Sequence, residues 1–160
     1  MSYEKIIINR DTLEKIYSLA REGFPYEICG WLRGNPVDGL VTDIRPAKNV
    51  YNQNNHPVVN NRTLETAYVI SPEDLLEMNN QFDSSVPPLV IYHSHPNGQA
   101  YLSETDRIVA TDPWGEGPSY PVQQLVIGIN SEEVVEAKLF DWNVSELKFI
   151  EVNIFSGMKI

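Results

Sequence analysis

The spacing of apolar side chains predicts an amphipathic helix near the start of the chain. Within Asn9–Glu22, the residues Leu13, Ile16, Tyr17 and Ala20 recur at intervals of three and four, which places them on one helical face. A glycine and a proline follow within three residues and end the pattern.

Two further helices are predicted from their first residues. Ser71–Asp74 combines a hydroxyl cap, a proline at the first helical position and two acids near the positive end of the helix dipole, so we expect a helix to about Phe82. A third helix is expected over Ser103–Thr111. Asn49–Asn61 is rich in asparagine, and Asp112–Pro121 holds three prolines and two glycines, so both are expected to be loops.

Short apolar runs between these segments predict strands. The expected strands are Lys5–Asn9, Ile28–Leu32, Leu40–Ile44, Leu89–His95, Gln124–Ile129, Val134–Trp142 and Leu147–Ile154. Strands interleaved with helices indicate an α/β fold. The sequence contains no repeat and no interdomain linker, so we expect a single domain over residues 1–160.

Composition and charge narrow the possible functions. The formal net charge is −10, with no basic cluster, so nucleic acid binding is not supported. No apolar run approaches the roughly 18 residues that span a bilayer, and the N-terminus has no signal-peptide pattern, so we expect a cytoplasmic protein that does not enter membranes. The single cysteine, Cys29, excludes an internal disulfide or a cysteine-based zinc site and is expected to pack as a small apolar residue.

Two histidines at the end of a predicted strand carry the main chemical signal. Because residues i and i+2 of a strand point to the same side, His93 and His95 can aim both imidazoles at one point. Asp106 lies in the first turn of the following predicted helix. Two imidazoles and one carboxylate suit a catalytic zinc ion and leave a fourth position for water. The alternative to metal binding is that these histidines are structural or simply exposed.

Two other polar residues admit two interpretations each. Ser103 and Asp106 have the spacing of a helix capping pair, a role that is compatible with metal binding by Asp106. A catalytic zinc site also needs a general base, and Glu27 is the candidate because it begins an otherwise apolar strand. An acid at this position is either exposed at the mouth of the strand or held there for a purpose.

The order and spacing of these residues resemble the JAMM (MPN-plus) zinc metallopeptidases. The resemblance rests on Pro25–Gly34, which contains Glu27, on His93–Pro96 and on the serine and aspartate of Ser103–Asp106, and it extends over nearly the whole chain. It implies a cytidine-deaminase-like α/β fold with a mixed, mostly antiparallel sheet flanked by helices.

The resemblance also implies a role for each polar residue. His93, His95 and Asp106 are expected to bind Zn²⁺. Glu27 is expected to take a proton from the attacking water and pass it to the leaving amine, and Ser103 to donate a hydrogen bond to the oxyanion.

Within that family, the chain looks most like small bacterial members. Val90–His95 and Ala100–Ser103 resemble peptidases that act on ubiquitin-like sulfur-carrier proteins, which implies cleavage after the C-terminal glycine pair of such a carrier. Asn49–Asn61 and Asp112–Pro121 differ from the compact pattern and could flank the substrate groove.

Three alternative functions fit the sequence less well. A catalytically silent MPN scaffold that binds partner proteins generally lacks metal ligands, and none is missing here. A zinc deaminase needs a Pro-Cys-x-x-Cys string, which one cysteine cannot supply. A helical His-Glu-x-x-His protease is excluded because no such string occurs.

Overall fold

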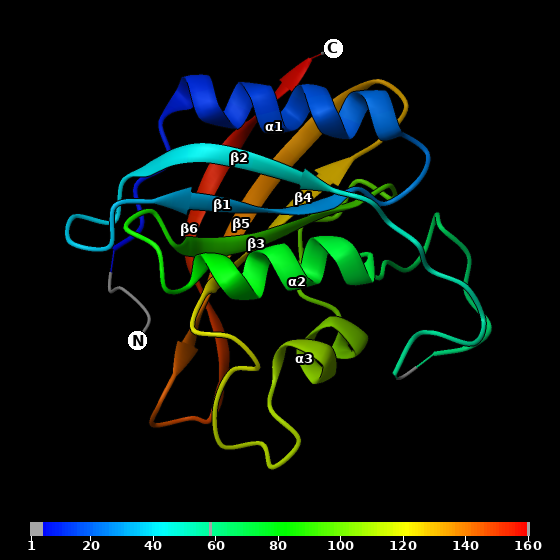
Figure 1. Ribbon diagram of the computed structural model, residues 1–160. Helices are drawn as coiled ribbons and strands as arrows, with labels where there is room; N and C mark the ends of the chain where they lie inside the picture. The colour runs from blue at the N-terminus through cyan, green and yellow to red at the C-terminus, as the bar shows by residue number, and fades with distance from the viewer. Residues whose placement is uncertain (1–4, 58, 160) are drawn as a thin grey trace.

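The computed structural model describes residues 5–57 and 59–159. In this part of the chain it contains three helices and six strands (Figure 1). The helices are α1 (Arg10–Gly23), α2 (Pro72–Gln81) and α3 (Glu104–Ala110). The strands are β1 (Cys29–Gly34), β2 (Val41–Ala47), β3 (Pro88–His95), β4 (Gln123–Ile129), β5 (Glu133–Asn143) and β6 (Lys148–Lys159).

All six strands form one sheet in the order β2-β1-β3-β4-β5-β6. Only β3 and β4 pair in parallel, and every other neighbouring pair is antiparallel. The parallel pair needs a crossover, which α3 and the loop after it provide. The predicted α/β class and the mostly antiparallel sheet are therefore confirmed.

The two faces of the sheet pack against different helices. The helix α1 covers one face with Leu13, Ile16, Tyr17 and Ala20, as the apolar spacing predicts, and α2 and α3 lie on the opposite side (Figure 1). Because side chains alternate along a strand, Val90 and Tyr92 of β3 pack in the α1 core, whereas Ile91 packs near α2. The same alternation directs His93 and His95 to the side of α2 and α3.

One predicted strand is wrong. Lys5–Asn9 forms a single parallel bridge, from Ile7 to Leu40, and no strand. The Ile7 N–H donates to Gly39 O and its carbonyl accepts from Val41 N, both at 2.9 Å. Burial does alternate as in a strand, because Ile6 and Ile8 are buried and Ile7 is exposed, but α1 begins at Arg10 and leaves no length for a ladder.

The remaining predicted elements are present with shifted ends. The last strand continues to Lys159, five residues beyond the predicted end. The strand predicted over Ile28–Leu32 is β1, which begins one residue later, at Cys29. Cys29 is buried, as expected. Among the described residues, no helix has both the length and the hydropathy that crossing a membrane requires.

Candidate metal centre

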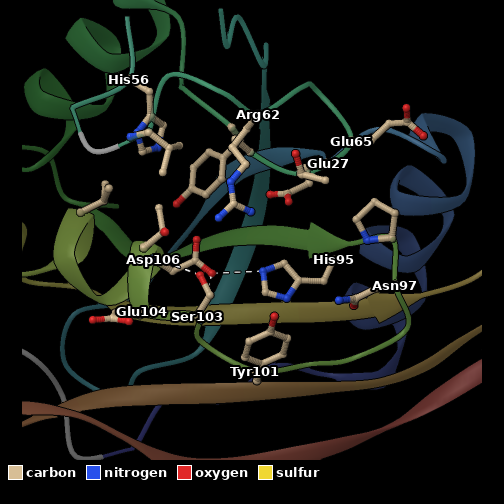
Figure 2. A pocket seen from close by; sticks show the side chains of 17 residues that line it. Glu27, His56, Arg62, Glu65, His95, Asn97, Tyr101, Ser103, Glu104 and Asp106 are labelled. Carbon is tan, nitrogen blue, oxygen red and sulfur yellow. Dashed lines mark hydrogen bonds and ion pairs between the residues drawn. The ribbon is translucent and has the colours of Figure 1, made fainter. Parts of the chain in front are cut away.

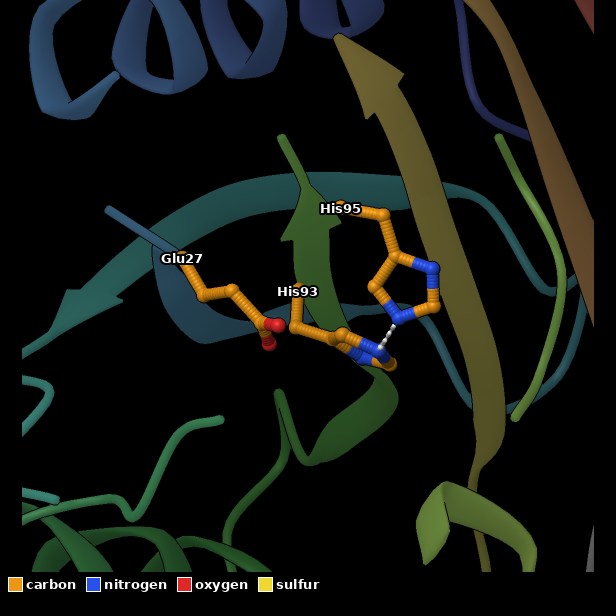
Figure 3. Close-up of side chains that lie close together, drawn as sticks. All are labelled: Glu27, His93 and His95. Atoms are coloured by element: carbon orange, nitrogen blue, oxygen red, sulfur yellow. Dashed lines mark hydrogen bonds between the residues drawn. The ribbon is translucent and has the colours of Figure 1, made fainter. Parts of the chain in front are cut away.

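The C-terminal end of β3 places two imidazoles together in the protein interior. His93 and His95 pair in register with Val126 and Gly128 of β4, and both side chains are buried. Their Nε2 atoms lie 3.1 Å apart (Figure 3). The i, i+2 spacing thus brings the two rings to one point, as the sequence predicts.

The first turn of α3 adds a carboxylate to this pair. Asp106 Oδ2 lies 3.1 Å from His93 Nε2 and 3.1 Å from His95 Nε2. The capping prediction is confirmed: the Ser103 hydroxyl accepts from the Asp106 N–H and Asp106 Oδ2 accepts from the Ser103 N–H, both at 3.1 Å. The cap therefore holds the carboxylate against the histidines.

We call Glu27, His93, His95 and Asp106 the cluster. A hydrogen bond to His95 Nδ1 determines which nitrogen of His95 is unprotonated toward this cluster. His95 Nδ1 lies 3.1 Å from the Gln99 carbonyl, which can only accept, so Nδ1 carries the proton and a neutral ring presents the Nε2 lone pair to the cluster. The ring of Tyr101 contacts His95 edge-on at 4.9 Å between centroids.

The ring of His93 is supported by stacking rather than by a hydrogen bond to its Nδ1. The ring of Tyr68 stacks on His93 at 4.7 Å, and His93 Nδ1 is buried without a hydrogen-bond partner in the described part of the chain. The position of the His93 ring therefore depends on packing against Tyr68.

Glu27 lies just before β1 and is buried rather than exposed at the strand's mouth. Its side chain approaches His93 (Figure 3), and donor atoms of Glu27, His93 and His95 all lie within 4.8 Å of one another. The Glu27 backbone N–H donates to Leu64 O at 2.8 Å, and its carbonyl accepts from Asn49 Nδ2 at 2.9 Å. The backbone that carries this carboxylate is thus fixed from two sides.

Burial and neighbouring charges set the protonation of the cluster. Burial alone raises the pKa of Asp106, but His93 and His95 outweigh it and hold that pKa well below its ordinary value. Burial lowers the pKa of His95, whereas the Asp106 carboxylate outweighs burial and raises the pKa of His93. Burial raises the pKa of Glu27 to about 8, although the charge of His93 opposes it. The cluster therefore holds one firmly ionised carboxylate and one that can exchange a proton near neutral pH.

The cluster opens into a cavity of about 380 Å³. One wall comes from the segment between β2 and α2, with His56, Arg62 and Glu65 (Figure 2). The opposite wall comes from the loop after β3 and the start of α3, and Ser103 lines it. Glu27, His95, Ser103 and Asp106 therefore all face the same cavity.

All five residues singled out in the sequence are brought together, but their supporting residues were not predicted. No sequence motif identifies Tyr68, Gln99 or Tyr101, because a stacking ring or a backbone carbonyl can support a histidine from any distance along the chain. Ser94 stands between the two histidines, and its hydroxyl accepts a hydrogen bond from the Ile28 N–H at 2.8 Å. The place of Ser94 inside the His93–Pro96 motif is the one sequence feature that could have indicated a supporting role.

Comparison with known proteins defines the family. Residues 9–141 match the model of the prokaryotic homologues of the JAB domain, and the chain belongs to this family. The match spans α1, all the residues of the cluster and most of β5.

Two curated relatives have named activities. A CysO-cysteine peptidase of Mycobacterium tuberculosis is 32% identical over 109 residues, which cover 68% of this chain and 67% of the relative. A desampylase of Haloferax volcanii is 32% identical over 118 residues, which cover 71% and 78% of the two chains.

Solved structures support the fold independently. A protein from Desulfitobacterium hafniense superimposes with a TM-score of 0.64 at 20% identity, over 93% of this chain and 90% of that one. A protein from Salinibacter ruber gives 0.60 at 18% identity, over 92% and 89%. At these identities the likeness concerns the fold alone.

Proposed function

We propose that this chain is a zinc-dependent peptidase that cleaves the bond after the C-terminal glycine pair of a ubiquitin-like sulfur-carrier protein. The observation that supports it best is the triangle of donor atoms on His93, His95 and Asp106, with 3.1 Å on each side. The names of the two relatives support a hydrolase, because both describe removal of a group from a protein or peptide.

The size of the triangle fits zinc. Tetrahedral zinc binds nitrogen and oxygen at about 2.0–2.1 Å, which separates neighbouring ligand atoms by about 3.3 Å. The three donor atoms already lie close to that separation, in a neutral imidazole, a second imidazole and an ionised carboxylate. Glu27, His93 and His95 form a looser set, within 4.8 Å, so we assign Glu27 to the reaction rather than to the metal.

Each residue of the cluster then has a distinct role. His93, His95 and Asp106 hold the zinc, which when bound supplies a Lewis acid that makes water acidic and polarises the scissile carbonyl. Glu27 accepts the proton of the attacking water and returns it to the leaving amine, a task suited to a carboxyl with a raised pKa. The Ser103 hydroxyl accepts from Asp106 N, so its proton is available to the oxyanion in the cavity.

Replacing Glu27 by glutamine tests this assignment. Glu27→Gln keeps the side-chain volume and removes proton transfer, so we expect unchanged zinc content and a loss of roughly 100- to 10,000-fold in kcat/KM on a carrier extended beyond its glycine pair. Glu65→Gln is the matched control, because this carboxylate lines the same cavity but is exposed. Full activity of Glu27→Gln would refute the mechanism.

The same experiment addresses the catalytically silent scaffold. A scaffold predicts no cleavage by the wild type under any zinc loading, together with full stability of the metal-free protein. A wild type that cleaves the extended carrier, and loses this activity on chelation, contradicts the scaffold.

A further inference from the structure

One cation faces the proposed catalytic centre. Arg62 belongs to the wall of the cavity between β2 and α2, and its side chain points toward Glu27 and Asp106 (Figure 2). It is the single lysine or arginine among the described residues that line the cavity, where the acids are Glu27, Glu65, Glu104 and Asp106.

The guanidinium of Arg62 has no partner in the described part of the chain. Its backbone N–H donates to the Tyr51 hydroxyl at 3.0 Å, so the main chain is anchored while no hydrogen bond or ion pair ends on the side chain. Every other arginine has a partner for its guanidinium, either a carboxylate or a backbone carbonyl; these are Arg10, Arg21, Arg33, Arg45 and Arg107.

The charge of Arg62 nevertheless acts on the centre. Burial raises the pKa of Glu27, and the positive charge of Arg62 is among the influences that oppose this rise. No ion pair joins the two residues, so the guanidinium donors remain free to bind an anion from the substrate.

The position of Glu27 determines which part of the substrate meets Arg62. In the proposed function Glu27 returns a proton to the leaving amine, so the leaving group lies beside Glu27, on the side of the cavity where Arg62 projects. When the leaving group is a single amino acid, its α-carboxylate is two bonds from the amine nitrogen. When it is the side-chain amine of a lysine in a protein, no carboxylate is present at that distance.

We infer that Arg62 is a specificity-determining residue that binds the α-carboxylate of a single C-terminal amino acid released by the enzyme. The inference rests on the proposed function and deepens it: it selects a carboxypeptidase-type substrate over an isopeptide-linked lysine. Binding by a guanidinium fork also explains why an otherwise acidic cavity contains an unpaired arginine.

Two matched substrates test the inference. A ubiquitin-like carrier is extended after its glycine pair by one alanine, in one case with a free carboxylate and in the other with a carboxamide. We expect the wild-type zinc-loaded enzyme to cleave the acid with a kcat/KM roughly 10- to 100-fold above that of the amide, which is the usual effect of one charge-assisted hydrogen-bonded pair. In Arg62→Gln the rate on the acid should fall far more than the rate on the amide, so that the ratio approaches one.

A control variant and a binding measurement separate this role from a structural one. Arg21→Gln removes an arginine on α1 and shifts the net charge from −10 to −11, as Arg62→Gln does, and should keep the ratio. In the Glu27→Gln background, fluorescence anisotropy with labelled carriers should show tighter binding of the acid than of the amide, and the further change Arg62→Gln should abolish the difference.

The outcomes distinguish the two proposals. Cleavage of both substrates with a ratio near one in the wild type, or a ratio that survives in Arg62→Gln, would overturn the role of Arg62 and leave the peptidase in place. Cleavage of neither substrate by zinc-loaded wild type would overturn the proposed function and this inference with it.

Discussion

The hydroxyl of Ser94 joins β3 to Ile28, the residue after the proposed general base Glu27, and the effect of removing it can be calculated. Ser94 lies between His93 and His95, is fully buried, and accepts a hydrogen bond from the Ile28 N–H at 2.8 Å. Its own N–H donates to the Ile28 carbonyl at 3.1 Å, so two hydrogen bonds join this point of β3 to the residue after Glu27. Ser94→Ala removes the first of these and leaves the second.

The expected loss of stability follows from the Ile28 N–H, which loses its acceptor in Ser94→Ala. Removing one partner of a hydrogen bond away from water costs about 1–3 kcal/mol, because the remaining N–H loses its acceptor. With a change of about 2 kcal/mol and a urea dependence of about 2 kcal/mol per molar, the unfolding midpoint falls by about 1 M. Because Ile28 follows Glu27, we also expect kcat to fall while zinc binding is retained.

Urea unfolding of the variant beside a matched control provides the assay. Ser18→Ala deletes the same atom from α1, where the exposed hydroxyl donates only to Glu14 O at 3.0 Å, so its effect should stay within about 0.5 kcal/mol. A Ser94→Ala midpoint indistinguishable from that of Ser18→Ala would refute the argument.

Two other predictions concern residues outside the cluster. Arg45 bonds to Asp74 and Glu77, both at 2.8 Å. Hydrogen bonds from the Lys48 N–H and Arg45 hold the pKa of Asp74 below its ordinary value, and Arg45 does the same for Glu77. A carboxyl whose pKa is lowered by folding stabilises the fold at pH values above its ordinary pKa, and this contribution is lost as pH falls through the lowered pKa of the folded state. Arg45→Gln should therefore destabilise the protein at pH 7, and the difference should shrink steadily as pH falls below the ordinary pKa values of 3.8 and 4.5. A stability difference that does not change over this acid range would contradict the argument. Cys29 is 1% exposed, and burial raises the pKa of its thiol to about 12. The native thiol should therefore react with an aromatic disulfide reagent roughly 100-fold more slowly than the thiol of the protein unfolded in urea. Rapid stoichiometric modification of the folded protein would contradict this prediction.

Local rules were sufficient for most of the fold. The period of α1, the proline-containing start of α2 and the capping pair of α3 each depend on residues within one or two turns, and all three helices occur where predicted. The strand expected over Lys5–Asn9 failed because its pairing depends on a distant residue, Leu40, and on where α1 begins.

The candidate site divides in the same way. His93, His95 and Asp106 could be predicted because strand and helix geometry restricts their spacing, and their metal-binding role stays a prediction. Tyr68 and Arg62 could not be predicted, because they come from the loop between β2 and α2 and reach the site only in the folded chain.

The close packing around the histidines could not be predicted from the sequence either. Gly128 lies beside His95 on the neighbouring strand, and a β-carbon there would stand 2.6 Å from the Gly98 carbonyl. The loop that supplies the Gln99 carbonyl to His95 therefore depends on a missing side chain on another strand. Nothing in the local sequence around Gly128 indicates this requirement.

Zinc content measured by elemental analysis tests the central claim most directly. We predict about one zinc per wild-type chain, loss of the metal in His95→Ala, and retention in His56→Ala, which removes the one histidine outside the donor triangle. Folded wild-type protein that contains no zinc, and binds none when it is supplied, would contradict the account.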